Sequence, residues 1–253
     1  MGGNSDYKLV REDGKRANGR EDNETRPLKF KVGVLNKAQG SCLLEWGKNK
    51  VLAGVYGPRE VFPKRLADAR KAVIFARYIM TPFSGIEGHG RSGPNRRSRE
   101  ISKVAAHVFE NTVITEKFPN TMIEVQMEVL QSDGGTRIAA TTAGILALAD
   151  AGIPLKDLPC GSGVGTIDNG RIVLDLDKYE DNLGESDIPT IISPRTGEIL
   201  LYQMDGYLTK EQLLESLDMV EKSACPAVHA EMERALKEKY EGVAREVNGG
   251  MNE

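Results

Sequence analysis

The residues best suited to chemistry in this chain are Gly134, Gly135, Thr136 and Arg137, which follow a strand-like pattern and open a helix-like one. The first N–H groups of a helix have no partner within the helix, and the helix dipole favours negative charge beside them. A hydroxyl and a guanidinium at this position add further donors for an anion. We therefore expect a cradle for one phosphate group. The same glycines are typical of a short structural turn, so the pattern alone leaves both interpretations open.

Two adjacent arginines, Arg96 and Arg97, stand just before a helical pattern. Guanidinium groups stay charged and can bind phosphate oxygens through two parallel hydrogen bonds. A solvated pair of charges would have the same sequence, so the dipeptide by itself does not decide between the two.

An acidic segment over 180–187 contains Asp181 and Asp187, whose spacing allows both to face one side of a site. Two neighbouring carboxylates can hold a divalent metal, or one of them can keep its proton and act as a general acid. Acidic loops are often merely solvated. Together with the arginines and the anion cradle, however, such a pair completes what phosphoryl transfer requires.

An alternation of strands and helices must position these side chains. Apolar residues alternate with polar ones over 123–129, which predicts a half-buried strand, and the Ala-rich run 138–153 predicts a buried helix. Further strand patterns cover 28–34, 42–46, 51–56, 72–80, 164–167, 171–176, 189–193 and 198–203. Further helical patterns cover 101–116, a stretch that begins after Thr209, and a charged stretch that restarts at Pro226 and ends near 245.

Strands followed by helices occur in both halves, which predicts the α+β fold class. We expect a flexible N-terminal extension over 1–18, a first part over 19–153, a second part over 154–245 and a frayed tail over 246–253. The segment 81–95 is rich in Gly, Ser and Pro and is expected to be a mobile surface loop.

The composition is that of a globular protein, with 253 residues, 40% hydrophobic and 28% charged. No apolar run approaches the ~20 residues of a membrane span, and the polar N-terminus is unlike a secretory signal, so we expect a cytoplasmic protein with no membrane partner. The three cysteines, Cys42, Cys160 and Cys225, are widely spaced and form no CxxC. They indicate reduced thiols rather than disulfides or a zinc site.

The net charge of −3 argues against a surface that binds nucleic acid everywhere. The segment 59–103, in contrast, holds eleven basic and four acidic residues, a local charge of +7. Lys64, Arg65, Arg96 and Arg97 all lie within it. Basic side chains bind phosphate backbones without regard to sequence, although a solvated surface explains the composition equally well.

The chain resembles the ribonuclease PH family from about Asp13 to about Gly242, and most closely the catalytic ring subunits of archaeal exosomes within that family. The matching motifs are Asp13-Gly14-Lys15-Arg16 with Gly19-Arg20, Val55-Tyr56-Gly57-Pro58-Arg59-Glu60, Tyr78-Ile79-Met80-Thr81-Pro82-Phe83, Arg96-Arg97 with Glu100, Leu130 to Arg137, Ala147 to Pro154, and Glu180 to Asp187. Their number and order make the resemblance specific.

The resemblance implies a two-part α+β unit, with a core like ribosomal protein S5 domain 2 and a smaller C-terminal part. It implies 3′→5′ phosphorolysis of RNA, with inorganic phosphate as co-substrate and nucleoside diphosphates as products, and the reverse addition of 3′ tails. Phosphate contacts would fall on Arg97, Gly135, Thr136 and Arg137. The general acid would be Asp181, supported by Asp187, with Mg²⁺ held by the two.

RNA would be bound by Arg96 and Arg97, and by Lys64 and Arg65 at the entry to the channel. The implied partners are single-stranded RNA 3′ ends, an inactive paralogous subunit in a hexameric ring with three of each, and a cap of S1/KH-type RNA-binding subunits. Two alternatives stay open: a homohexameric enzyme that trims tRNA 3′ ends, and a non-catalytic RNA-binding scaffold of such a ring.

Overall fold

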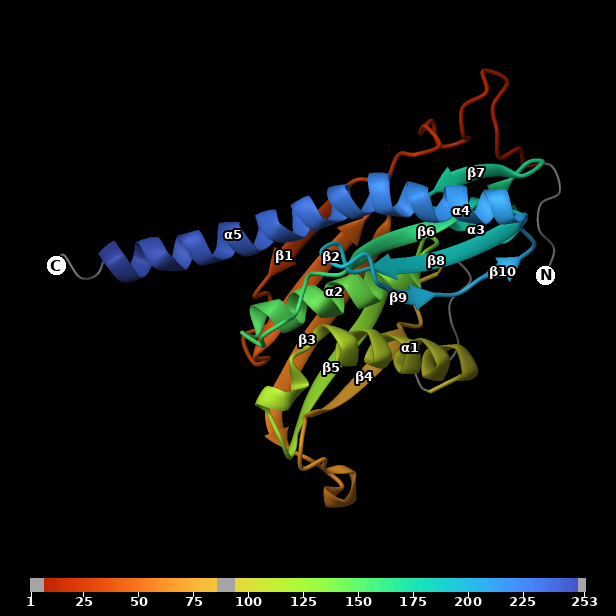
Figure 1. Ribbon diagram of the computed structural model, residues 1–253. Helices are drawn as coiled ribbons and strands as arrows, with labels where there is room; N and C mark the ends of the chain where they lie inside the picture. Colours follow the sequence, from red (N-terminus) through yellow and green to blue (C-terminus); the bar gives the residue numbers. More distant parts are fainter. Residues whose placement is uncertain (1–6, 86–93, 250–253) are drawn as a thin grey trace.

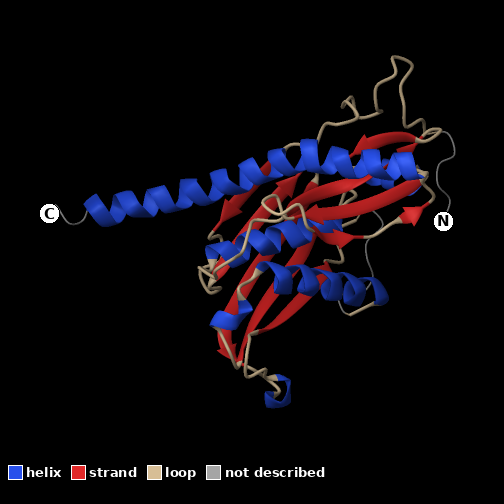
Figure 2. Ribbon diagram, viewed as in Figure 1, coloured by secondary structure: helices blue, strands red, loops and turns tan. Residues whose placement is uncertain are grey.

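The computed structural model describes residues 7–85 and 94–249, with side chains described to residue 241. Two five-stranded sheets and the helices packed on them form the molecule, and the α+β class predicted from the sequence is confirmed (Figures 1 and 2). The segment expected to be a mobile loop, 81–95, falls largely on residues outside this description.

The first sheet has the strand order β1-β2-β3-β5-β4, in which only β4 and β5 run parallel. Its strands are β1 (Leu28–Val32), β2 (Gly40–Trp46), β3 (Asn49–Glu60), β4 (Val73–Met80) and β5 (Thr121–Gln131). The alternation in β5 is borne out, because Ile123, Val125, Met127 and Val129 are fully buried while the residues between them are not. This regularity places the end of β5, and the turn after it, at one edge of the core.

Helix α2 (Thr136–Asp150) lies between the two sheets, as Figure 1 shows. It contacts β2, β3 and β5 on one side and β6 and β8 on the other, so nearly all of its side chains are buried. That position explains its Ala-rich sequence, since small residues allow close approach on every face. Helix α1 (Arg96–Thr112) covers β4 beside it and ends four residues before the predicted limit, because the backbone turns extended at Val113.

The second sheet has the order β10-β8-β6-β7, with β9 paired to β8. Its strands are β6 (Cys160–Ile167), β7 (Arg171–Leu174), β8 (Ser186–Ile192), β9 (Ile199–Tyr202) and β10 (Asp205–Gly206). The prediction that the acidic segment 180–187 is a loop is wrong, because most of it belongs to regular elements. Its first residues belong to a short helix, α3 (Lys178–Leu183), and Asp187 lies in β8.

The C-terminal helices cross the back of the second sheet. Helix α4 (Lys210–Met219) begins after Thr209 as predicted, with a capping box of Thr209 and Gln212, and a π-helical turn (Val220–Ala224) leads directly into α5 (Cys225–Gly249). Pro226 therefore does not break the chain: it lies directly after the π-helical turn, and the helical run continues through it into α5. The tail predicted to be frayed from 246 is helical to Gly249. No helix in the described part of the chain is long and apolar enough to cross a membrane.

The N-terminal segment differs most from its prediction. Residues 7–18 were expected to be part of a flexible extension, yet Leu9 is buried and Arg16 is completely buried. The Arg16 guanidinium binds both carboxylate oxygens of Glu180, at 2.7 and 2.5 Å, and donates to the carbonyl of Leu174 at 2.8 Å. A polar sequence is held against the second sheet here by ion pairing, together with the packing of Leu9 against Ile167, Val173 and Leu176.

Candidate active site

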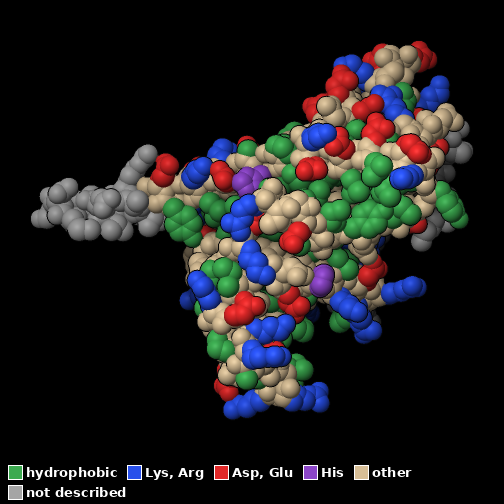
Figure 3. All heavy atoms as spheres, in the orientation of Figure 1, with side chains coloured by type: hydrophobic (Ala, Val, Ile, Leu, Met, Phe, Trp, Pro, Cys, Tyr) green, Lys and Arg blue, Asp and Glu red, His purple; other side chains and the backbone are tan. Residues whose placement is uncertain are grey.

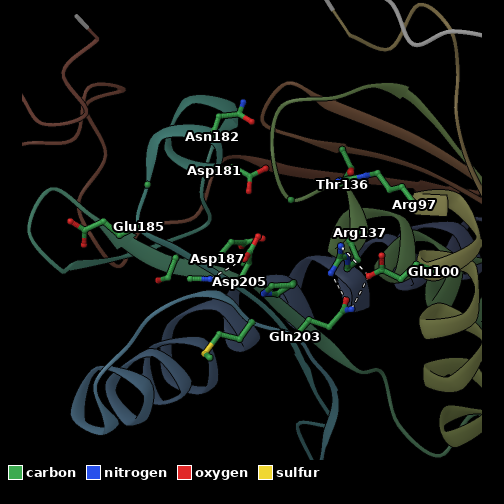
Figure 4. A pocket seen from close by; sticks show the side chains of 17 residues that line it. Arg97, Glu100, Thr136, Arg137, Asp181, Asn182, Glu185, Asp187, Gln203 and Asp205 are labelled. Atoms are coloured by element: carbon green, nitrogen blue, oxygen red, sulfur yellow. Dashed lines mark hydrogen bonds and ion pairs between the residues drawn. The ribbon is translucent and has the colours of Figure 1, made fainter. Parts of the chain in front are cut away.

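A cavity of ≈ 640 Å³ opens where the N-termini of α1 and α2 meet α3, β8 and the β9–β10 segment. Arg97, Thr136, Arg137, Asp181 and Asp187 all line it (Figure 4). The first half of the chain supplies the basic wall and the second half supplies the acidic one.

The turn before α2 has the geometry of an anion cradle. Gly134 and Gly135 adopt left-handed backbone conformations, with φ of 72° and 66°. Asn95, Asp177 and Thr209 cap the N-termini of α1, α3 and α4 through capping boxes, whereas no side chain of the described residues caps α2. The exposed N–H groups and the positive end of the α2 dipole are therefore left to face the cavity.

Two buried side chains hold this turn in place. Asn49 accepts from the Asp133 N–H at 2.6 Å and donates to the carbonyl of Gly134 at 2.6 Å. Arg26 donates to the carbonyl of Asp133 and, through the rest of its guanidinium, to both oxygens of Asp175, at 2.6 and 2.9 Å. Because its carbonyls are bound from behind, the turn presents its N–H groups to the cavity with little freedom to reorganise.

The arginines project from two helix N-termini. Arg97 lies in the first turn of α1, and Arg137 is the second residue of α2. Arg137 donates to the side-chain oxygen of Gln203 and lies 3.7 Å from Glu100, while the Gln203 amide donates to Glu100 at 3.0 Å. These contacts orient the Arg137 guanidinium along the cavity wall, as the dashed lines of Figure 4 show.

The two aspartates face the arginines across the cavity. The pKa of Asp187 is raised to about 7, first by burial, then by repulsion from the charge of Asp181 and, to a smaller extent, of Asp205. The positive charges of Arg137 and Arg97 lower it and so oppose this shift. Desolvation also raises the pKa of Asp181, against the charges of Arg97 and Arg137. Asp181 lines the cavity and remains exposed to solvent, so its desolvation is partial. The pair can therefore retain a proton near neutral pH.

The position of Asp181 depends on its neighbour in the chain. Glu180 is buried and bound by Arg16, and its carboxylate also accepts from the Asp177 N–H at 2.9 Å as part of the α3 capping box. Arg20 lies 3.4 Å from the same carboxylate. Anchoring Glu180 from both sides fixes α3 and thereby the direction of the Asp181 side chain.

The structure brings together six of the predicted site residues and leaves three outside the cavity. Arg97, Gly135, Thr136, Arg137, Asp181 and Asp187 line it. Arg96 begins α1 next to Arg97, without lining the cavity. Lys64 and Arg65 lie in an exposed 3₁₀ turn (Lys64–Leu66) at the lower tip of the molecule, where basic side chains gather in Figure 3.

The cavity is also lined by residues that were not predicted as site residues, among them Glu100, Gln203 and Asp205. Glu100 follows Arg97 by one helical step of three residues, which is a signal that could have found it. Gln203 and Asp205 follow a strand of the second sheet and carry no such local signal.

A divalent metal would have two carboxylates here. Among the described residues, no group of three or more His, Cys, Asp or Glu side chains is placed to hold a metal ion. Mg²⁺ is commonly held by only one or two protein carboxylates, with water and substrate phosphate as its other ligands, so Asp181 and Asp187 fit that ion.

Taken together, the cavity can bind a small anion on one wall and donate a proton from the other. The helix N-terminus and two arginines can offset the repulsion between an anionic nucleophile and a phosphodiester. A carboxyl of raised pKa opposite them can protonate a leaving oxygen.

Comparison with known proteins agrees with this chemistry. Residues 24–154 match the profile of the "3′ exoribonuclease family, domain 1", and residues 157–223 match domain 2 of the same family. The chain is 51% identical over 250 residues to the "Exosome complex component Rrp41" of Thermococcus onnurineus, covering 99% of both chains. It is 52% identical over 242 residues to the protein of that name from Pyrococcus furiosus, covering 96% of both.

Solved structures share the fold. A crystal structure of rice Rrp46 superposes with a TM-score of 0.77 at 26% identity, covering 88% of this chain and 100% of the rice chain. A chain of the Archaeoglobus fulgidus exosome with RNA bound to the active site gives a TM-score of 0.71 at 23% identity, covering 90% of this chain and 93% of its own, which shows a common fold.

Proposed function

The chain belongs to the ribonuclease PH family of 3′ exoribonucleases, and on that premise we propose that it is the catalytic subunit of an exosome ring that shortens RNA from the 3′ end by phosphorolysis. The single observation that carries this proposal is the cavity in which an uncapped helix N-terminus and two arginines face two aspartates of raised pKa.

Inorganic phosphate would occupy the basic wall. The N–H groups that follow Gly135, the Thr136 hydroxyl, and the guanidinium groups of Arg97 and Arg137 would bind its oxygens. These donors are already in place before binding, so little reorganisation is required when charge develops in the transition state.

An oxygen of the phosphate then attacks the phosphorus of the last phosphodiester. The bond from that phosphorus to the 3′-oxygen of the preceding nucleotide breaks, and Asp181 supplies the proton that this oxygen takes up. The products are a nucleoside diphosphate and an RNA shorter by one nucleotide. In the reverse reaction, a nucleotide is added to the RNA from a nucleoside diphosphate. Phosphorolysis replaces a phosphodiester bond with a phosphoanhydride bond, and the reverse reaction does the opposite.

Asp187 would support Asp181, and the two carboxylates would hold Mg²⁺. When bound, that ion would supply positive charge beside the substrate phosphates. Arg96 would bind the RNA backbone next to Arg97. Lys64 and Arg65 belong to the same basic segment of the sequence but lie outside the cavity, so they would contact RNA before it reaches the cavity.

The relatives of the chain support its assembly with other subunits. Proteins similar along nearly their whole length are named exosome components, and a chain of similar fold belongs to an exosome with bound RNA. We propose a hexameric ring with an inactive paralogue, three of each, beneath S1/KH-type cap subunits.

The test is incubation of the chain, alone and with its paralogous partner, with 5′-labelled RNA and Mg²⁺, in the presence or absence of phosphate. We expect RNA shortening with release of nucleoside diphosphates only when phosphate is present. Asp181→Asn should lower kcat by at least about 10²-fold, the usual contribution of a general acid. The matched control is Glu110→Gln, which removes an exposed carboxylate of α1 and should leave kcat unchanged.

Other outcomes point elsewhere. Nucleoside monophosphates formed without phosphate would make the enzyme a hydrolase. Full activity of the chain alone as a homohexamer would favour the tRNA-trimming type, and RNA binding with no product under any condition would favour the scaffold.

A further inference from the structure

Tyr78 is a buried tyrosine with its hydroxyl at the phosphate wall. It lies in β4 and is 1% exposed. Its backbone N–H donates to Ser102 on α1 at 2.9 Å, and the side chain reaches the first residue of α2. The residue therefore joins the two helices whose N-termini carry Arg97 and Arg137.

The Tyr78 hydroxyl lies 2.9 Å from the Thr136 hydroxyl, and either oxygen could be the donor. The choice matters for anion binding, since a threonine hydroxyl has only one hydrogen. If Thr136 donates to Tyr78, it turns only lone pairs towards the cavity and repels an anion. If Tyr78 donates to Thr136, the Thr136 hydrogen is free to bind a phosphate oxygen.

Burial, which is the main influence on Tyr78, raises the pKa of its phenol, although hydrogen bonding to Thr136 and Arg97 and the charges of Arg97 and Arg137 oppose this. The phenol therefore keeps its proton over the working pH range and remains a donor. Hydrogen bonds in such a chain polarise one another, so a proton donated to Thr136 strengthens the bond that Thr136 itself donates.

We propose that Tyr78 is a positioning residue for inorganic phosphate: its hydroxyl donates to Thr136 and so directs the Thr136 hydrogen at the anion. The inference rests on the proposed function for the identity of the anion. It adds a role for a residue that does not itself line the cavity.

The experiment measures phosphate binding to the full chain by calorimetric titration, together with phosphate KM and kcat in the active assembly. Tyr78→Phe should raise the phosphate Kd and KM about three- to tenfold, the range for one hydrogen bond, while kcat at saturating phosphate changes less than about twofold. The matched control is Tyr240→Phe, which removes a hydrogen bond to the Asp150 carbonyl of 3.1 Å far along the chain. It should leave the phosphate Kd unchanged.

A double-mutant cycle separates positioning from a structural effect. Thr136→Val keeps the shape of the side chain and removes the hydroxyl, so Tyr78→Phe should have no further effect on the phosphate Kd in that background. In the Thr136→Ser background, which keeps the hydroxyl, the three- to tenfold effect should persist.

Equal phosphate Kd values for Tyr78→Phe and Tyr240→Phe would overturn the proposal, as would an undiminished Tyr78→Phe effect in Thr136→Val. Failure of the proposed function has a different signature, namely wild-type chain and partner that form no nucleoside diphosphate. In that case the calorimetric Kd values still decide the role of Tyr78.

Discussion

At the scale of single residues, Asp181 and Asp187 titrate as a coupled pair, so an apparent pKa belongs to the pair rather than to one carboxyl. The highest pKa, about 7, falls on Asp187, with burial as its first cause and the Asp181 charge as its second. The resemblance instead names Asp181 as the donor. These two assignments predict different pH profiles.

If Asp181 donates the proton, Asp187→Asn should move the alkaline limb of kcat/KM to lower pH, because the neighbouring negative charge that helps the pair to keep a proton is gone. If Asp187 donates it, the same change should abolish turnover at every pH, because the donor itself is gone. Inorganic phosphate also titrates near neutral pH, but it does so identically for both enzymes. The difference between the wild-type and variant profiles therefore reports on the carboxyls alone.

The raised pKa of Asp187 also predicts a stability effect. A carboxyl with a higher pKa in the folded than in the unfolded chain favours folding below the unfolded pKa of about 4, and that contribution is lost as pH rises through about 7. Asp187→Asn should therefore raise Tm at pH 8 and have much less effect at pH 4.5. Each 1 kcal/mol corresponds to about 2–4 °C in a chain of this size. Glu110→Gln should show no such difference between the two pH values.

The residues that the sequence could predict are those with a local signal. Gly134 to Arg137 were found because strand alternation stops and a helical pattern begins there. Asp175 and Arg16 were not chosen as supports of the site, because their partners lie 149 and 164 positions away in the chain. Only the folded chain brings such pairs together, and local patterns carry no trace of them.

At the scale of elements, the two neighbouring glycines before α2, Gly134 and Gly135, differ in the space that surrounds each of them. A Cβ on Gly135 would meet its nearest atom, of Arg26, at 3.4 Å, which is tolerable. A Cβ on Gly134 would lie 2.6 Å from the Asp177 carbonyl carbon and 2.7 Å from the Leu176 oxygen, both backbone atoms just before α3.

Gly135→Ala should thus cost about 1–2 kcal/mol of unfolding free energy, the penalty for a left-handed alanine, and should raise the phosphate KM. Gly134→Ala should cost more and lower kcat as well, because it pushes α3 and Asp181 away. Urea denaturation and steady-state kinetics measure both. The control is Gly152→Ala after α2, where φ is 71° and no atom lies within 4 Å of the new Cβ. It should match the stability loss of Gly135→Ala with an unchanged phosphate KM.

Most elements were predictable because their periodicity is regular, as in β5 and α2. Helix α3 was missed because six residues with one buried side chain, Glu180, give no amphipathic pattern. The N-terminal segment was misjudged for a related reason. Its most deeply buried residue is an arginine, and sequence patterns associate arginine with solvent.

At the scale of the whole molecule, the pair of Arg26 and Asp175 is one of the buried ion pairs that join the two halves of the chain. Arg26 precedes the first sheet and Asp175 follows β7 of the second, and Trp46 also donates to Asp175 at 2.9 Å. Burial opposes ionisation of Asp175, but the charge and hydrogen bonds of Arg26 hold its pKa below the ordinary value.

Asp175→Asn should lower the unfolding free energy by about 3–5 kcal/mol at pH 7, because it leaves the Arg26 charge buried without its carboxylate. The loss should shrink below about pH 4, where the unfolded wild-type carboxyl takes up its proton. Glu124→Gln is the matched control. It breaks the ion pair with the half-exposed Arg59 and should cost less than about 1 kcal/mol. Equal losses for the two variants in urea denaturation would contradict a special role for the buried pair.

The same ion pair has a consequence for the chain during its synthesis. Residues enter the folding molecule in order, at about 5–20 per second, so the glycine turn emerges several seconds before Asp175, the carboxylate that holds its supporting arginine. Until then the turn lacks its final backing, and Asp181 and Asp187, the proposed proton donor and its support, have not yet been added to the chain. An unfinished or prematurely terminated chain should therefore be unable to degrade the messenger RNA from which it is being translated.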